Sequence, residues 1–452
     1  MKNFKLEPMD QGLCGGVWTS PGFKQLMEEL SYDIGPRPTG SKGMQEGQKL
    51  LAAKLRKLGV KGVHTEPVPV RAWQEEPSRL ELVAPRQRAY ESLHCVHSAA
   101  GALTASLVDA GTGTLEDLDR LGLKLDGAVA LIGGHVISGA KYVPLPRQVQ
   151  RISERGGVAV LLRSMYQVGG SPAIELAAVT QPTSIPVIGI SYEAGFELAA
   201  FARSGKAKVN LECAGKSFST RCSNLAGELG PSKSQESIIL SAHLDTFYLN
   251  PGSLDNLTGV ITLMEVVRAL APLQTDFQRR LRILIYTGEE YGFLGSQSYV
   301  QRHLSELEAI RFVFNMDTLF PATAEGVAVM WSPTMRDYIH AVFQGIQRPL
   351  EVRNLFCMSS DYLPFLLQGV PAARPADWRN SMPIWSHTAM DTPDKVNLDW
   401  LRMNAMIYAQ LLARMLRDPD PLPAVRKTSA EVESLLEKEQ VIEAMESFGL
   451  MG

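Results

Sequence analysis

Residues 237–299 constrain the fold more than any other stretch, because they place charged side chains where two apolar strand patterns end. The runs 238–242 and 281–287 are rich in Ile and Leu, as buried strands are. A helical pattern over 257–270 lies between them. In open α/β sheets, ligands bind outside the carboxyl ends of the strands. The segment therefore predicts a site built from the charged residues that follow the two strands, which are His243, Asp245, Glu289 and Glu290.

The sheet that contains these two strands continues further along the chain. Two more apolar runs, 310–316 and 326–331, follow, and helical patterns separate several of the four strands. Strands that alternate with helices favour a doubly wound α/β fold, with a mostly parallel, mixed sheet and right-handed connections. Amphipathic helices are expected at 335–346 and 398–416.

A chain of 452 residues is too long for one compact core, so two domains are expected. Short strands with glycine punctuation alternate with helices across residues 97–215, which predicts a smaller inserted α/β domain. The main domain is then discontinuous, with residues 1–96 and 216–425. Residues 426–452 are expected to form a charged C-terminal helical tail, for which packing, a partner contact and a solvated face all stay open.

Composition excludes several classes of partner. The formal net charge is −3, so no basic surface for nucleic acid or a membrane is indicated. No window holds 18 consecutive apolar residues, and the N-terminus lacks an apolar secretory segment. The five cysteines contain no CxxC pair, which argues against a thiolate zinc site and favours a reducing compartment. We therefore expect a cytoplasmic protein without nucleic-acid or membrane partners, and homo-oligomerisation stays open.

The residues that follow the strands are of the types that bind metal ions. A two-metal hydrolytic site needs nitrogen and carboxylate ligands, a bridging group and a general base that binds neither ion. His243 supplies a nitrogen, and Asp245 can hold its ring through the second nitrogen. Asp255 lies at a loop–helix junction, Asp317 follows an apolar run, and His387 lies in a loop. Each alone is more often a turn residue or a helix cap, but their joint occurrence favours a metal site.

Glu289 and Glu290 are adjacent, so their side chains diverge. One can bind metal while the other faces the attacking water as general base. The alternative is a solvated pair, which is the commoner state of two neighbouring glutamates.

Six motifs resemble those of the di-zinc exopeptidase family that includes bacterial aminopeptidases and plasma glutamate carboxypeptidase. In chain order they are SAHLDT, GSLDNLTGV, YTGEEYGFLGS, FNMD, SSDYLPFLLQGVP and SHTAMDTPDKV. The resemblance covers most of residues 20–95 and 216–416. Residues 97–215 also resemble the protease-associated domain inserted in many members, through DLDRLGLKLDGAVALI and SIPVIGIS.

The resemblance implies a fold of the zinc-exopeptidase type that holds two zinc ions, with other divalent ions left open. It implies that His243 and Asp317 bind one ion. Glu290 and His387 would bind the other ion, and Asp255 would bridge the two.

The remaining implied roles concern proton transfer and backbone geometry. Glu289 would be the general base, and Asp245 would hold the ring of His243. In the family a cis peptide follows the bridging aspartate, which would here be Asp255-Asn256.

Together these roles imply a metal-dependent exopeptidase that hydrolyses peptide bonds at the end of small peptides, as an aminopeptidase or a dipeptidase. Two alternatives stay open: a related di-zinc amidohydrolase acting on a non-peptide amide, and a non-catalytic binding protein, although no ligand of the set is missing. The substrate side is less defined, because Ser360-Asp361-Tyr362 resembles a pocket motif and equally fits the first turn of a helix.

Overall fold

The chain divides into two compact units in the computed structural model, which describes residues 4–133, 143–165, 180, 182–231, 234–319, 326–376, 378 and 385–451. The first unit comprises Met1–Val70, Thr220–Pro383 and Asp391–Leu435. The second unit comprises Arg71–Ser219, Ile384–Met390 and Leu436–Gly452.

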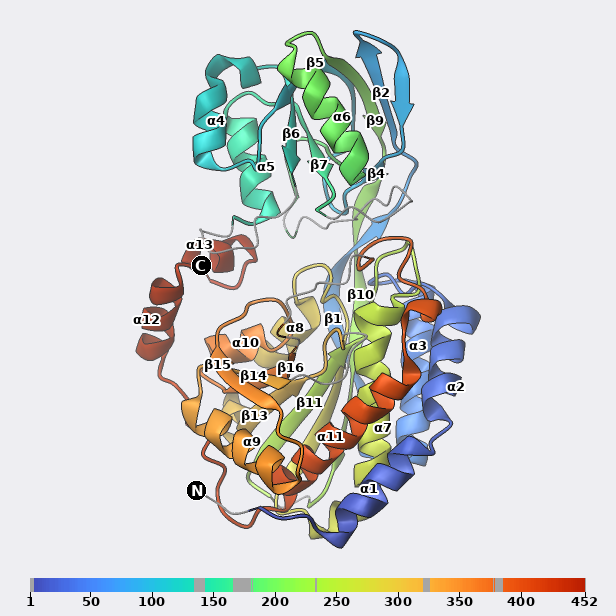
Figure 1. Ribbon diagram of the computed structural model, residues 1–452, viewed down its shortest axis with the longest axis vertical. Coiled ribbons are helices and arrows are strands. Elements are labelled where there is room, and N and C mark those ends of the chain that lie inside the picture. Colours follow the sequence, from blue (N-terminus) through green and yellow to red (C-terminus); the bar gives the residue numbers. More distant parts are fainter. Residues whose placement is uncertain are drawn as a thin grey trace. The chain divides into compact units, whose positions relative to one another are not determined.

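The first unit is built on an eight-stranded mixed sheet with a parallel centre (Figure 1). Its order is β1-β10-β12-β11-β13-β16-β14-β15. In chain order the strands are β1 Lys61–Gln74, β10 Lys216–Leu229, β11 Ser237–His243, β12 Arg280–Tyr286, β13 Ile310–Asn315, β14 Gly326–Met330, β15 Glu351–Leu355 and β16 Ala372–Ala376. Strands β12, β11, β13 and β16 are parallel, whereas β10 runs antiparallel to β12 and β14 antiparallel to β16. The predicted mixed, mostly parallel α/β fold is confirmed.

Alternate side chains of the central strands face two different layers. On β12, Leu281, Ile283 and Ile285 are fully buried in the main hydrophobic core. The helices that bury apolar side chains in this core are α1 Pro8–Trp18, α2 Gly22–Glu28, α3 Lys42–Lys57, α7 Thr258–Leu270, α9 Pro333–Gly345 and α11 Leu398–Arg417. Helices α1, α7 and α11 lie side by side (Figure 1).

The intervening residues of β12 face the opposite layer. Arg282 reaches the hydroxyl of Tyr299 at 3.1 Å on α8 Leu294–Arg302. Helix α8 in turn packs on α10 Leu363–Leu367, where the rings of Tyr299 and Phe365 lie 6.0 Å apart. The sheet is therefore covered on both faces, as a parallel sheet requires.

Helix α7 crosses the core of the first unit. Among the described residues, one helical stretch, Ser253–Asp276, is long and apolar enough to cross a membrane. Of its most apolar window, 78% is buried inside the protein, as expected of a core helix.

The second unit has its own eight-stranded sheet, in the order β3-β2-β9-β5-β6-β7-β8-β4. The strands are β2 Arg79–Ala84, β3 Arg88–Tyr90, β4 Leu93–His94, β5 Gly101–Asp109, β6 Val129–Gly133, β7 Ala159–Arg163, β8 Val187–Ile190 and β9 Lys208–Cys213. Strands β5 to β8 are parallel. The helices of this unit that precede residue 219 are α4 Leu115–Leu121, α5 Leu145–Glu154 and α6 Tyr192–Arg203.

The second unit begins earlier than the boundary expected at residue 97. Strand β2 pairs antiparallel with β9, and β4 pairs with β8, so residues 71–96 belong with the insertion. Partners such as Leu80 and Leu211 are far apart in the chain, and a local pattern does not reveal that pairing.

The C-terminal residues do not form a separate body. Helix α12 Ser429–Glu439 spans the division between the units, and α13 Ile442–Ser447 belongs to the second unit. Glu443 Oε1 lies 2.9 Å from Arg147 Nε and 2.5 Å from Arg151 Nη2, both on α5. The C-terminal part of the predicted tail, α13, therefore packs against α5.

Candidate metal centre

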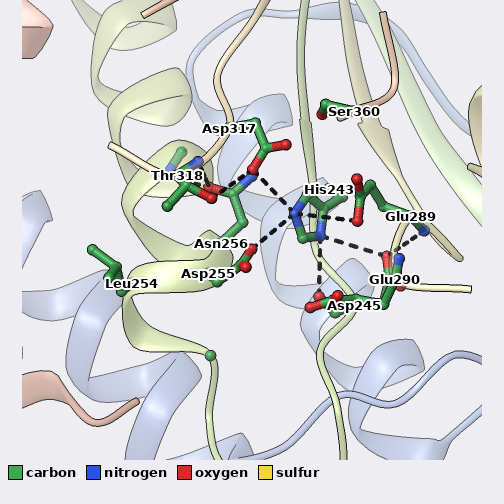
Figure 2. Close-up of polar contacts among 12 residues, drawn as sticks. His243, Asp245, Leu254, Asp255, Asn256, Glu289, Glu290, Asp317, Thr318 and Ser360 are labelled. Carbon is green, nitrogen blue, oxygen red and sulfur yellow. Dashed lines mark hydrogen bonds and ion pairs between the residues drawn. The ribbon is translucent and has the colours of Figure 1, made fainter. Parts of the chain in front are cut away.

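Three predicted ligands converge in the first unit. His243 Nε2 lies 3.2 Å from Asp255 Oδ1 and 3.4 Å from Asp317 Oδ1 (Figure 2). One ligand atom from each of the three lies within 4.8 Å of the other two. An imidazole nitrogen and two carboxylate oxygens at this spacing can share one divalent cation.

The register of the sheet explains why His243 and Asp317 meet. Strands β11 and β13 are parallel neighbours, with Ser241 opposite Asn315. His243 and Asp317 each follow two residues later, so both lie at the same edge of the sheet. Ser241 Oγ donates to Asn315 Oδ1 at 2.7 Å, which ties the two strands just below the site.

Asp255 comes from the turn before α7, and hydrogen bonds fix that turn. The backbone N–H groups of Leu254 and Asp255 donate to the carboxylate of Asp391, at 2.7 and 3.1 Å. The peptide bond Asp255-Asn256 is cis, as the family resemblance implied.

The side chain of Asn256 ties the Asp255 turn to the loop that carries Asp317. Its Nδ2 donates to the Met316 carbonyl at 2.9 Å, and its Oδ1 accepts from the Thr318 N–H at 3.1 Å (Figure 2). Asn256 is 1% exposed. One buried amide therefore brackets Asp317 on both sides.

Asp245 holds the two glutamates more directly than it holds the histidine. Its carboxylate accepts the backbone N–H groups of Glu289 and Glu290, at 3.2 and 3.3 Å, and the hydroxyl of Thr39 at 3.0 Å. His243 Nδ1 lies 3.2 Å from the Asp245 carbonyl oxygen and 3.8 Å from its nearest carboxylate oxygen. The ring of His243 is thus oriented through the Asp245 backbone, while the carboxylate fixes the glutamate turn.

Glu289 and Glu290 diverge from this turn. Glu289 Oε2 lies 3.9 Å from His243 Nε2. A Glu290 oxygen lies within 4.8 Å of one from Asp255. The two side chains therefore reach the cluster at different points and do not form a solvated surface pair.

The negative charge of the cluster raises the pKa values of His243 and Glu289. Burial alone lowers the pKa of His243, but Glu289, Asp255 and Asp317 together raise it well above its usual value. Burial raises the pKa of Glu289, and Asp317 and Glu290 raise it further against the opposing effect of His243. Four acidic groups around one imidazole leave an excess of negative charge that a divalent cation would compensate, and their nitrogen and oxygen donors suit zinc.

His387 is the remaining predicted ligand. It lies in Ile384–Met390, which belongs to the second unit, and its φ is 59°. The first unit alone therefore brings together six of the seven predicted site residues: His243, Asp245, Asp255, Glu289, Glu290 and Asp317.

Sequence reasoning missed the residues that support the ligands. Arg37 is fully buried, and its guanidinium donates to the carbonyl oxygens of Leu244 at 2.9 Å and Pro251 at 2.7 Å. Its burial lowers its pKa to about 10, against the opposing effects of Asp245 and Asp391. The turn-rich segment around Arg37 gave no sign of this role, whereas Asp391 lay within a recognised motif.

The chain is similar to several known peptidases. Residues 224–412 match the model of peptidase family M28. Mouse carboxypeptidase Q is 23% identical over 86% of this chain and 84% of its own length. A solved peptidase M28 precursor from Shewanella amazonensis covers 92% of this chain and 98% of its own, with a TM-score of 0.78 and 22% identity. A zinc aminopeptidase from Bacillus subtilis covers the same shares with a TM-score of 0.67 and 21% identity. The chain therefore has the fold of these solved peptidases, and its residues 224–412 are similar to peptidase family M28.

Proposed function

We propose that this protein is a zinc-dependent exopeptidase that releases residues from the end of small peptides, acting as an aminopeptidase. The match of residues 224–412 to the model of peptidase family M28, and the similarity to a zinc aminopeptidase and a carboxypeptidase, support a metal-dependent exopeptidase. The observation that carries the proposal is the convergence of His243, Asp255 and Asp317 beside Glu289.

The proposed site holds two ions. His243 and Asp317 would hold one, Glu290 and His387 the other, and Asp255 would bridge them. The short distances from Asp255 to His243 on one side and to Glu290 on the other support the bridging role. When bound, zinc supplies a Lewis acid that polarises the scissile carbonyl and lowers the pKa of water.

Glu289 is the proposed general base. Its backbone is fixed by Asp245, and its carboxylate lies 3.9 Å from the His243 ring nitrogen, at the margin of the ligand cluster. From there the carboxylate takes the proton of the attacking water and returns it to the leaving amine. Asp245 serves this step by holding the turn in place.

The proposal is tested on purified protein by measuring metal content and hydrolysis of aminoacyl p-nitroanilides, dipeptides and N-acyl amides. The expected result is about two equivalents of zinc and release of N-terminal residues that a chelator abolishes and zinc restores. A folded protein that binds no zinc and cleaves none of these peptides would refute it. Preferential cleavage of the non-peptide amides would favour an amidohydrolase instead.

We propose a reducing compartment such as the cytoplasm as the place of action. Among the described residues, none of the five cysteines (Cys14, Cys95, Cys213, Cys222 and Cys357) forms a disulfide, which supports this assignment. Fractionation of cells that express the untagged protein tests it, and a predominantly exported pool would contradict it.

A further inference from the structure

We infer that Arg374 binds a carboxylate group of the substrate, so that the enzyme prefers small peptides with a negative charge near the scissile bond. This inference rests on the proposed exopeptidase function and names the substrate class of that same site.

The sheet places Arg374 beside the ligand cluster. It lies on β16, the parallel neighbour of β13, where Ala373 is opposite Phe314. Asn315 is the residue after Phe314 and Arg374 is the residue after Ala373, so these two lie opposite each other on adjacent strands. Side chains of residues opposite each other on adjacent strands point to the same face of the sheet. The predicted ligand Asp317 comes two residues after Asn315.

A chain of hydrogen bonds connects Arg374 to the same edge. Its Nη1 donates to the Ser359 hydroxyl at 3.2 Å. The adjacent Ser360 accepts from Asn315 Nδ2 at 2.7 Å, and Figure 2 draws Ser360 together with the ligand cluster. The segment that carries Ser359 and Ser360 therefore passes over the strand ends and brings Arg374 to the border of the site.

Within the described part of the chain, the guanidinium of Arg374 has N–H donors without a hydrogen-bond acceptor. Its side chain is half-buried, and among the described residues no Asp or Glu oxygen lies within hydrogen-bonding distance of it. Burial lowers the pKa of Arg374, but electrostatic interactions with Cys357, Tyr362 and Asp317 outweigh burial and raise it, so the guanidinium keeps its positive charge. By contrast, Arg353 on β15, which β14 separates from β16, donates to both carboxylate oxygens of Glu351, at 2.7 and 2.9 Å.

A planar guanidinium matches a carboxylate in two parallel hydrogen bonds. The cluster itself is rich in carboxylates, which repel an anionic substrate unless a cation offsets them. The substrate carboxylate has two sources: the side chain of an acidic terminal residue, or the free C-terminus of a dipeptide. Both present the same chemistry to Arg374.

Two pairs of substrates separate these sources in full-length, zinc-loaded enzyme. Glutamyl p-nitroanilide against glutaminyl p-nitroanilide isolates the side-chain carboxylate. Leucyl-leucine against leucyl-leucinamide isolates the C-terminal carboxylate. For Arg374→Gln, kcat/KM should fall about 100-fold on the charged member of one pair, and by no more than about threefold on its neutral partner. The pair that responds identifies the source.

Three further variants control the experiment. Arg353→Gln removes a nearby cation that already has a partner and should leave every kcat/KM unchanged. Arg374→Lys keeps the positive charge but lacks the two-pronged donor geometry of the guanidinium, so it should recover part of the lost kcat/KM. It also keeps the inference testable if Arg374→Gln folds poorly. Cys357→Ser tests whether Arg374 serves only to pair with the thiol, because that role predicts the same selectivity change in both variants.

The outcomes are distinct. Equal losses on both members of each pair, no loss on any substrate, or the same profile in Cys357→Ser overturns the carboxylate role. If wild-type enzyme hydrolyses none of the four substrates, the proposed function fails, and the inference fails with it. Melting temperature and zinc content of each variant show whether a loss reflects folding.

Discussion

At the scale of single residues, the two carboxylates that sequence reasoning placed outside the ligand set do different work. Glu289 reaches the cluster with its side chain, whereas Asp245 lies completely buried behind it. The distances therefore separate the proposed proton acceptor, Glu289, from Asp245, which holds the backbone. Their substitutions should differ accordingly.

Glu289→Gln removes the proposed proton acceptor and keeps the shape of the side chain. We expect kcat to fall by about 10³-fold while zinc content stays at the wild-type level, because Glu289 is proposed to bind neither ion. Steady-state kinetics and metal analysis on the same preparation measure both. Glu290→Gln is the matched control and should lose metal. Turnover near wild type in Glu289→Gln would exclude it as the base.

Asp245→Asn replaces one oxygen acceptor by an N–H₂ donor at a buried position. The carboxylate accepts from two backbone N–H groups and from Thr39, so at least one of these donors loses its partner. The free energy of unfolding should fall by about 2 kcal/mol. Urea denaturation of the chelated protein measures this without the contribution of metal. Thr39→Val removes one of the three hydrogen bonds and should cost about 1 kcal/mol; an equal cost for both variants would contradict the assignment.

At the scale of elements, Glu66 on β1 joins that strand to the end of α8. Its carboxylate lies 3.0 Å from His303 Nε2 and 2.9 Å from Arg302 Nη1, and the side chain is 8% exposed. Burial raises the pKa of Glu66, but hydrogen bonds from His303 and Arg302 outweigh it and lower the pKa to about 2. The hydrogen bond to Glu66 is in turn the largest cause that raises the pKa of His303.

The raised pKa of His303 predicts a pH-dependent contribution to stability. A histidine whose pKa is higher in the folded than in the unfolded protein stabilises the fold. Its full contribution is present below the unfolded pKa of 6.5, and the contribution is lost as the pH rises through the folded pKa. His303→Gln should therefore cost about 1 kcal/mol near pH 5.5 and less near pH 9.

Denaturation curves of wild type and variant at both pH values measure this difference. His64→Gln is the control, because His64 is 3.3 Å from the same carboxylate but its side chain is 58% exposed. It should cost less than about 0.5 kcal/mol at either pH. A cost of His303→Gln that does not change with pH would contradict the coupling.

Several elements followed from the sequence because their signals are local. The runs 238–242 and 281–287 became β11 and β12 within a residue, and the helix expected at 398–416 became α11. The direction of β14 and the pairing of β2 with β9 were not predictable, because each depends on partners far along the chain. The candidate site was predictable to a similar extent. The charged residues that converge after the strand ends were visible in the sequence, whereas Arg37 and Asn256 act through contacts that no local pattern encodes.

At the scale of the whole molecule, each unit has a sheet and a hydrophobic core of its own. Six of the seven predicted site residues belong to the first unit. The loops that carry them hold a high density of acidic groups, which repel one another unless a cation is bound. The effect of metal removal should therefore be concentrated in these loops.

Hydrogen exchange on the intact chain tests this localisation. Adding a chelator should speed exchange of backbone amides in 244–256 and 316–319, because those loops lose the cation that offsets their charges. Amides of β6 and β7 in the second unit should exchange at unchanged rates, and they serve as the internal control. Uniform acceleration across both units would show that metal supports the fold globally instead.

The buried amide of Asn256 has a consequence for how this molecule can vary. Asp255 and Asp317 lie 62 positions apart in sequence, yet one side chain of fixed covalent dimensions sets their separation. Residues inserted or deleted in the intervening 257–315 stretch, away from the strand ends, would leave that separation unchanged. The spacing of the two acids is thus insulated from changes in the length of the chain that connects them.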